Sequence, residues 1–223
     1  MFRSANRVSS VKHFISLLFR DTLQRIRFVS FKKQEAYNTN SKIMERRTFV
    51  NPAINDSATF IKTSAETEGE YTLIEIDLGK SDGPPLHYHN AFSETFEVRE
   101  GVLYLQTGKE KRKLNIGQSF TVQAGTPHRF YNEVDNRVKF HITLQPGHTG
   151  MENFIKIIYG LASDGLTDKK GKPTNFSHLA VALQISDTNS PGWMSLLSPV
   201  IRSAAKRAKK NGTEKWLLDR YCK

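Results

Sequence analysis

The sequence is almost without cysteine: among 223 residues the only one is Cys222, next to the C-terminal lysine. A single thiol cannot form an internal disulfide, which excludes the disulfide-stabilised class of secreted domains and favours a reducing compartment. The chain also has no run of 18 apolar residues, and this excludes a membrane-spanning helix. Together these absences predict a cytoplasmic protein. A hydrophobic content of 38% is modest, so we expect one good core and some solvated length.

Acidic residues are scarce only at the two ends of the chain. Residues 1–43 carry nine Lys/Arg against Asp21 and Glu35, and residues 202–223 carry eight against Glu214 and Asp219. The stretch between them has a net charge of −2, although the whole chain has +11. The basic charge therefore belongs to the ends, and the middle of the chain lacks the basic stripe of a nucleic-acid surface. We do not expect a nucleic-acid partner.

Residues 1–43 are poor in acid, rich in Arg and Ser, and place apolar residues on one helical stripe. Three interpretations stay open. The segment resembles an organelle-targeting presequence, or a surface helix for peripheral membrane association. The third is that translation starts at Met44, so that 1–43 is not translated. We favour this start, or a basic N-terminal tail at 1–43 that is helical or disordered.

From about residue 48 to 145 short segments with alternating apolar residues follow one another, punctuated by Gly and Pro. This spacing is typical of a β-sandwich or barrel. The predicted strands are 58–65, 71–78, 86–89, 93–99, 102–107, 111–115, 118–122, 126–132 and 137–145.

After Pro146 the apolar period becomes helical. Thr149 and Glu152 have the spacing of a capping box, which predicts a helix from there to Gly160. A second helix is expected at 176–184. A third, basic helix is expected to start with Ser198 as N-cap and Pro199 in the first turn.

Gly212 should end that third helix. The last apolar residues, Trp216, Leu217 and Tyr221, are then expected to dock on the barrel wall or on a partner subunit.

Two histidines and a glutamate lie close together in the segment GPPLHYHNAFSE, residues 83–94. In an extended chain side chains alternate, so His87 and His89 should project to one side. Beyond a short turn, Glu94 shares its parity with Phe96 and Val98, whereas Glu97 falls on the polar face. Glu94 is therefore the carboxylate expected to point inward.

A second segment, QAGTPH at residues 123–128, follows Gly117 and is followed by Asn132. Here His128 shares a face with Phe130 and Asn132. Three imidazoles and a carboxylate inside an apolar barrel would be costly to bury unpaired, and a divalent cation would remove that cost.

Together the two segments resemble the paired motifs of the cupin superfamily, although Ser81 and Gln123 replace a turn glycine and a turn proline of its consensus. The resemblance implies a mainly β, double-stranded β-helix (jelly-roll barrel) at 44–148, with a C-terminal helical extension at 149–223. It also implies one divalent metal ion with the ligands His87, His89, Glu94 and His128. Fe(II) is favoured, with Mn, Ni, Cu or Zn as alternatives.

The function that the resemblance implies is a metal-dependent enzyme acting on a small organic molecule, most often a dioxygenase-like oxidoreductase. Isomerase and decarboxylase activities stay open, because the motifs do not separate them. The alternative is a non-enzymatic small-ligand-binding or sensor module, in which the basic C-terminal helix engages an anionic partner or is simply an exposed face. A homodimer is plausible for a jelly roll, but no residue pattern proves it.

His141 is the one further candidate. It lies in the last predicted strand among Lys139, Thr143 and Gln145, which favours the outer surface. Were that face internal, His141 would sit beside the metal ligands as an acid–base group.

Overall fold

The computed structural model of this protein describes residues 46–223. The predictions made for residues 1–43 and for the start at Met44 lie outside these residues.

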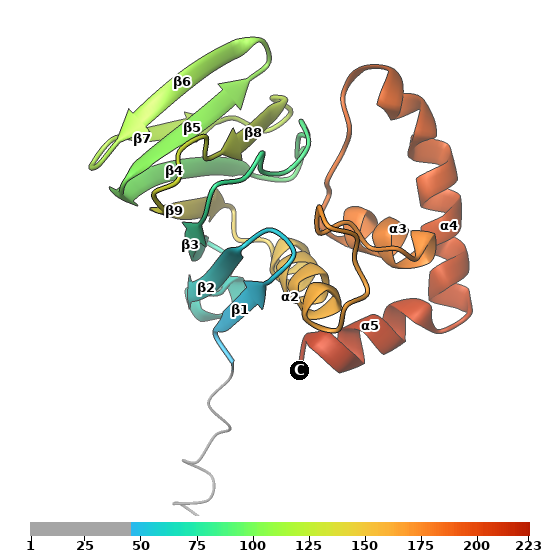
Figure 1. Ribbon diagram of the computed structural model, residues 1–223. Coiled ribbons are helices and arrows are strands. Elements are labelled where there is room, and N and C mark those ends of the chain that lie inside the picture. The colour runs from blue at the N-terminus through green and yellow to red at the C-terminus, as the bar shows by residue number, and fades with distance from the viewer. Residues whose placement is uncertain (1–45) are drawn as a thin grey trace, which may run out of the picture. The chain divides into compact units, whose positions relative to one another are not determined.

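The described part begins with two antiparallel β-sheets (Figure 1). The larger sheet has the strand order β1-β2-β3-β9-β4-β7 and the smaller one β6-β5-β8. Neighbouring strands pair antiparallel throughout both sheets. The strands are β1 (Thr48–Asn51), β2 (Asp56–Lys62), β3 (Thr72–Leu78), β4 (Ser93–Glu100), β5 (Val102–Thr107), β6 (Glu110–Asn115), β7 (Ser119–Val122), β8 (His128–Tyr131) and β9 (Val138–Gln145).

The main core lies between the two sheets. Buried and more exposed residues alternate along β3, β4 and β9, as expected for strands with one face covered. Phe130 of the smaller sheet packs against Phe96 and Phe140 of the larger one, with ring centroids 5.9 and 5.2 Å apart. These aromatic contacts hold the two sheets together. The predicted architecture, mainly β with helices after the last strand, is confirmed.

The predicted strand 58–65 is wrong at both ends, because β2 runs from Asp56 to Lys62. Thr63 then starts the 3-10 helix η1 (Ser64–Thr67): its hydroxyl accepts the N–H of Glu66, and the Glu66 carboxylate accepts the N–H of Thr63 at 2.8 Å. This reciprocal capping box ends the strand.

The predicted strand 86–89 is also wrong. Its backbone makes only isolated antiparallel bridges, between His87 and His128 and between Tyr88 and Asn189. Pro84 and Pro85 lack the N–H groups that a longer ladder would need.

Five helices follow the last strand: α2 (Thr149–Ser163), α3 (Phe176–Ile185), the 3-10 helix η2 (Gly192–Leu197), α4 (Ser198–Lys210) and α5 (Thr213–Tyr221). None of the helices in residues 46–223 is long and apolar enough to cross a membrane. The prediction of α3 is one residue short, and α4 ends before Gly212 as expected.

The capping predictions were wrong. The N-cap of α2 is His148, whose Nδ1 accepts the N–H of Met151 at 3.0 Å. Glu152 instead accepts hydrogen bonds from the Ser64 N–H and the Thr72 hydroxyl, at 2.6 and 2.7 Å, and so ties the helix to the sheet. Ser198 is the first residue of α4 rather than its N-cap.

Gly160 lies inside α2 and does not end it. A Cβ atom there would lie 2.2 Å from the Tyr221 ring, so glycine allows α5 to approach α2. Leu217 of α5 docks on the helices of this chain and not on the barrel wall. It belongs to a second buried cluster with Ile157, Leu161, Val181 and Ala208.

Asp56 ties β2 to α2 in a buried setting. Its Oδ2 accepts a 2.7 Å hydrogen bond from the Tyr159 hydroxyl, while its Oδ1 has no partner among the described residues. Burial raises the pKa of Asp56 from 3.8 to about 6. Because the folded state holds this proton more tightly than the unfolded chain, the stabilisation is complete below pH 4 and is lost as the pH rises through 6.

We therefore expect Asp56→Asn to stabilise the protein at pH 7–8 by about 3 kcal/mol, and to have little effect near pH 4. Asparagine can still accept from Tyr159 but carries no charge to desolvate. Urea unfolding across this pH range measures the difference. Asp135→Asn, at a position 89% exposed, is the control and should change stability little at any pH. A loss of stability at pH 8 in Asp56→Asn would contradict the prediction.

Candidate metal centre

The four side chains singled out in the two motifs converge. One donor atom from each of His87, His89, Glu94 and His128 lies within 4.8 Å of the other three. His89, Glu94 and His128 are 2%, 4% and 2% exposed, and His87 is the most accessible of the four. The sequence thus placed together residues that are 41 positions apart in the chain.

The backbone brings the two motifs face to face. His87 and His128 exchange N–H to carbonyl hydrogen bonds of 3.0 and 2.7 Å across their bridge. Glu94 lies in β4, opposite Val122 of β7 and Leu144 of β9, so its inward direction is fixed by the sheet. The expected inward parity of Glu94 with Phe96 and Val98 is confirmed by their burial.

Each of the three imidazoles holds its Nδ1 against a backbone carbonyl. His87 pairs with Pro85 at 2.8 Å, His128 with Thr126 at 2.9 Å, and His89 with Asp187 at 3.2 Å. A carbonyl can only accept, so each Nδ1 is the protonated nitrogen and each Nε2 is directed to the other side of its ring. This is the tautomer and orientation that imidazole ligands of metals adopt.

The Nε2 atoms meet at the glutamate. His128 Nε2 lies 2.5 Å from Glu94 Oε2, and His89 Nε2 lies 3.9 Å from the same oxygen. Within residues 46–223 the buried His89 Nε2 has no hydrogen-bond partner. A buried acceptor without a partner costs free energy that a cation at the centre would recover.

The donor set fits a transition metal. Ligand atoms lie about 2.0–2.2 Å from such an ion, which puts opposite ligands about 4.2 Å apart, so the 4.8 Å spread closes with small side-chain shifts. Three imidazoles with one carboxylate suit Fe, Mn, Ni, Cu or Zn better than Mg or Ca. The cluster could hold one divalent metal ion.

The surroundings shift the pKa values of the three imidazoles in different directions. Burial lowers the pKa of His87 to about 4, with the neighbouring imidazoles adding to the effect, and burial also lowers the pKa of His89. Burial would raise the pKa of the Glu94 carboxyl, but the hydrogen bond with His128 and the nearby imidazoles outweigh it and lower that pKa. At His128 burial alone would lower the pKa, but the hydrogen bond and the charge of Glu94 outweigh it and raise that pKa. His128 and Glu94 therefore hold a proton between them, and a divalent cation would take the place of that proton.

A segment outside both motifs supports the centre. Asp187 follows α3 with φ +53°, and its carboxylate accepts the N–H groups of Asn90 and Ala91 at 2.6 and 2.8 Å. Its own carbonyl holds His89, as described above. Asn189 extends the contact by bridging to Tyr88. The loop 186–191, here called the α3 strap, therefore fixes the first motif from 98 residues away.

Sequence reasoning missed the α3 strap. An Asp in a polar stretch between two helices gives no sign of its partner, because nothing in the spacing places it beside His89.

Aromatic rings cover the centre on the barrel side. Phe92 stacks on His89 with centroids 4.5 Å apart, and Phe96 meets His128 edge-on at 6.0 Å. Both phenylalanines are buried, which keeps this side of the cluster apolar.

The structure does not bring His141 to the cluster. Its Nε2 lies 3.4 Å from Glu75 Oε2, on the face of β9 opposite the buried Phe140 and Ile142. This is the outer-surface alternative that the sequence favoured.

Comparison with known proteins agrees with this architecture. The family described as "Cupin domain" matches residues 72–150. An epoxidase of Aspergillus terreus is 30% identical over 105 residues, covering 44% of this chain and 32% of the epoxidase. A probable oxidoreductase of Hypocrea virens is 30% identical over 124 residues, covering 49% of this chain and 56% of that protein. The chain thus spans about a third and about half the length of these two relatives.

Among solved structures, an RmlC-like cupin from Shewanella frigidimarina is 17% identical, with a TM-score of 0.40, and the match covers 47% of this chain and 87% of that one. The residues matched by the family include all four members of the cluster. Residues 72–150 of this chain therefore form a domain of the cupin superfamily.

Proposed function

We propose that His87, His89, Glu94 and His128 bind one divalent metal ion, Fe(II) by preference. The observation that carries the proposal is the common orientation of the three imidazoles, each with Nδ1 on a carbonyl and Nε2 directed at the cluster. Burial alone does not explain this arrangement. Three buried histidines need hydrogen-bond partners, but their Nε2 atoms need not point to one place.

The proposed activity is that of a metal-dependent, dioxygenase-like oxidoreductase acting on a small organic molecule. A metal held by four protein ligands would have a further coordination position and could supply redox or Lewis-acid chemistry there. The more accessible His87 marks the side from which a substrate would approach, whereas the buried Phe92 and Phe96 pack on His89 and His128. The two fungal relatives, an epoxidase and a probable oxidoreductase, support an oxidative reaction. Dimer formation and a cytoplasmic location stay predictions.

Removing one imidazole should remove the metal. We expect His89→Ala or His128→Ala to weaken Fe(II) or Zn(II) affinity by about 100-fold or more, because a buried carboxylate and two imidazoles leave the ion under-coordinated. Elemental analysis of protein purified without chelator, followed by metal titration, measures this. His141→Ala is the matched control, since it removes a histidine of the outer face. Equal metal content in all four proteins would refute the proposed ligands.

The α3 strap should act through His89. Asp187→Ala removes the acceptor of two N–H groups, so we expect metal affinity to fall about 10–100-fold, as for other groups that orient a ligand. Asp187→Asn keeps one acceptor oxygen and tolerates positive φ, and should restore part of the affinity. Asp168→Ala is the control, because the Asp168 carboxylate also accepts two backbone N–H groups, but these belong to Lys170 and Lys172 of its own loop. If Asp168→Ala and Asp187→Ala have equal effects on metal affinity, the strap has no special role.

Oxygen uptake tests the activity. Protein loaded with Fe(II) should consume O2 in the presence of members of a panel of phenolic and unsaturated carboxylic compounds, and a dioxygenase would place both atoms of 18O2 in the product. Protein loaded with Zn(II), and His128→Ala, should consume none. A compound that binds near the metal but causes no O2 uptake and no product would favour the non-enzymatic module. An anaerobic isomerisation or decarboxylation would replace the oxidative reaction with a Lewis-acid one.

A further inference from the structure

The turn before α4 exposes large apolar side chains. Here the η2 apolar surface means Trp193, Met194, Leu196, Leu197 and Val200, which are 75%, 41%, 78%, 46% and 55% exposed. None of the six residues of η2 is buried. Single exposed apolar residues are ordinary, but five within eight positions form a contiguous patch of the kind that marks an interaction site.

The helix that follows is basic on its outer side. Between Ser190 and Gly212 the chain has five Lys/Arg and no Asp or Glu. The α4 basic face consists of Arg202, Lys206, Arg207, Lys209 and Lys210, all of them exposed. Only Lys209 has a carboxylate within ion-pair distance among the described residues, Glu214 at 3.5 Å.

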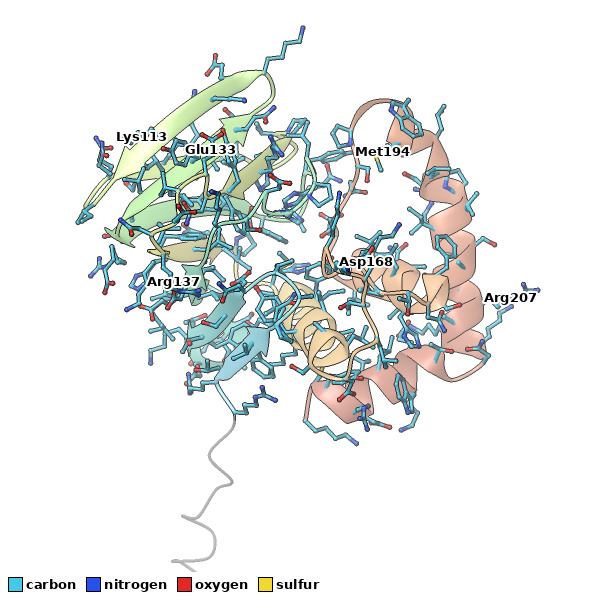
Figure 2. The ribbon with its side chains drawn as sticks, viewed as in Figure 1. Lys113, Glu133, Arg137, Asp168, Met194 and Arg207 are labelled. Carbon is cyan, nitrogen blue, oxygen red and sulfur yellow. The ribbon has the colours of Figure 1, made fainter. Side chains whose placement is uncertain are left out.

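The two surfaces are adjacent along the chain, because Val200 lies in the first turn of the helix that carries the basic residues. Ala205 and Ala208 are the buried residues of α4, so the face of the helix with small side chains packs inward and the charged face is exposed to solvent. Val200 and Arg207 are seven residues apart and share one side of the helix. Figure 2 shows Met194 at the turn that precedes α4 and Arg207 projecting from α4 away from the sheets.

We propose that the η2 apolar surface and the α4 basic face together bind the surface of an anionic phospholipid bilayer. The apolar side chains of the turn would enter the boundary between head groups and acyl chains, where Trp193 is favoured, and the lysines and arginines would contact the lipid phosphates. Charge complementarity favours a lipid bilayer over a second copy of this chain. A second copy would bring two basic faces together, whereas an anionic bilayer can bind both the basic face and the apolar surface. A nucleic acid would use the basic face and leave Trp193 and Leu196 in water.

This proposal is independent of the metal centre. No residue of either surface belongs to the cluster, so loss of metal binding and loss of bilayer binding can be measured separately.

The chain offers its own reporter, since its only tryptophans are Trp193 and Trp216. In the full-length Trp216→Phe protein, Trp193 is the sole tryptophan, and residues 1–43 contain none. With vesicles of phosphatidylcholine and phosphatidylserine we expect its emission to shift to shorter wavelength and to be quenched by brominated lipid. Pure phosphatidylcholine should give little change, and added salt should reduce the shift.

Variants of the full chain test both surfaces. Leu196→Ser combined with Leu197→Ser should lower partition into anionic vesicles about tenfold or more. Lys206→Ala with Arg207→Ala should lower it by about tenfold, since each basic residue near such a surface contributes a few-fold. The matched controls are Ile116→Ser, at an apolar position 66% exposed, and Lys111→Ala with Lys113→Ala on β6; both should bind like the parent.

Three outcomes would overturn the proposal. The first is unchanged Trp193 emission on anionic vesicles, and the second is equal vesicle binding by all of these variants. The third is a dimer, detected by sedimentation equilibrium, that Leu196→Ser with Leu197→Ser abolishes, which would assign the apolar surface to a second copy of the chain. Circular dichroism of each variant checks that the fold is intact.

Discussion

The structure depends on one constraint: an ionisable carboxylate and three imidazoles lie within an apolar barrel, and each polar atom must find a partner there. The barrel meets most of this demand with backbone carbonyls, which bind every Nδ1 of the three histidines. What remains is a group of Nε2 atoms around Glu94, one of them without a hydrogen-bond partner among the described residues. Backbone carbonyls do not satisfy these Nε2 atoms, because the carbonyls that contact the rings are bound to Nδ1, on the other side of each ring. A cation completes it at least cost.

The same constraint links the helices to the barrel. Two of the three carbonyls come from the cupin domain, but the third belongs to Asp187, beyond residues 72–150. The position of that residue depends on α3, which packs with α2, α4 and α5 around Leu217 and its neighbours. Glu152 anchors the start of α2 to η1 and β3. The helical extension is therefore part of the support of the first motif, although it contributes no member of the cluster.

The distribution of charge separates two roles in one chain. The cluster lies among buried residues, whereas five exposed apolar residues and five exposed basic residues follow one another on η2 and α4. The proposed metal site and the proposed bilayer-binding surface make opposite demands on burial, and they lie on different elements of the fold.

The sequence by itself determined the alternation that makes the strands and the inward parity of Glu94, because these depend on local period and spacing. The pairing of the two histidine motifs was predicted from their resemblance to the cupin superfamily. Local signals failed where a distant contact overruled them. Thr149 and Glu152 have the spacing of a capping box, but Ser64 and Thr72 take the glutamate; Gly160 reads as a stop, yet it lies inside α2 because Tyr221 needs the space. Only the tertiary structure decided that Asp187 holds His89, that Leu217 docks on helices, and that His141 faces outward. Each of these results from packing between segments far apart in the chain, and no pattern within a single segment encodes that.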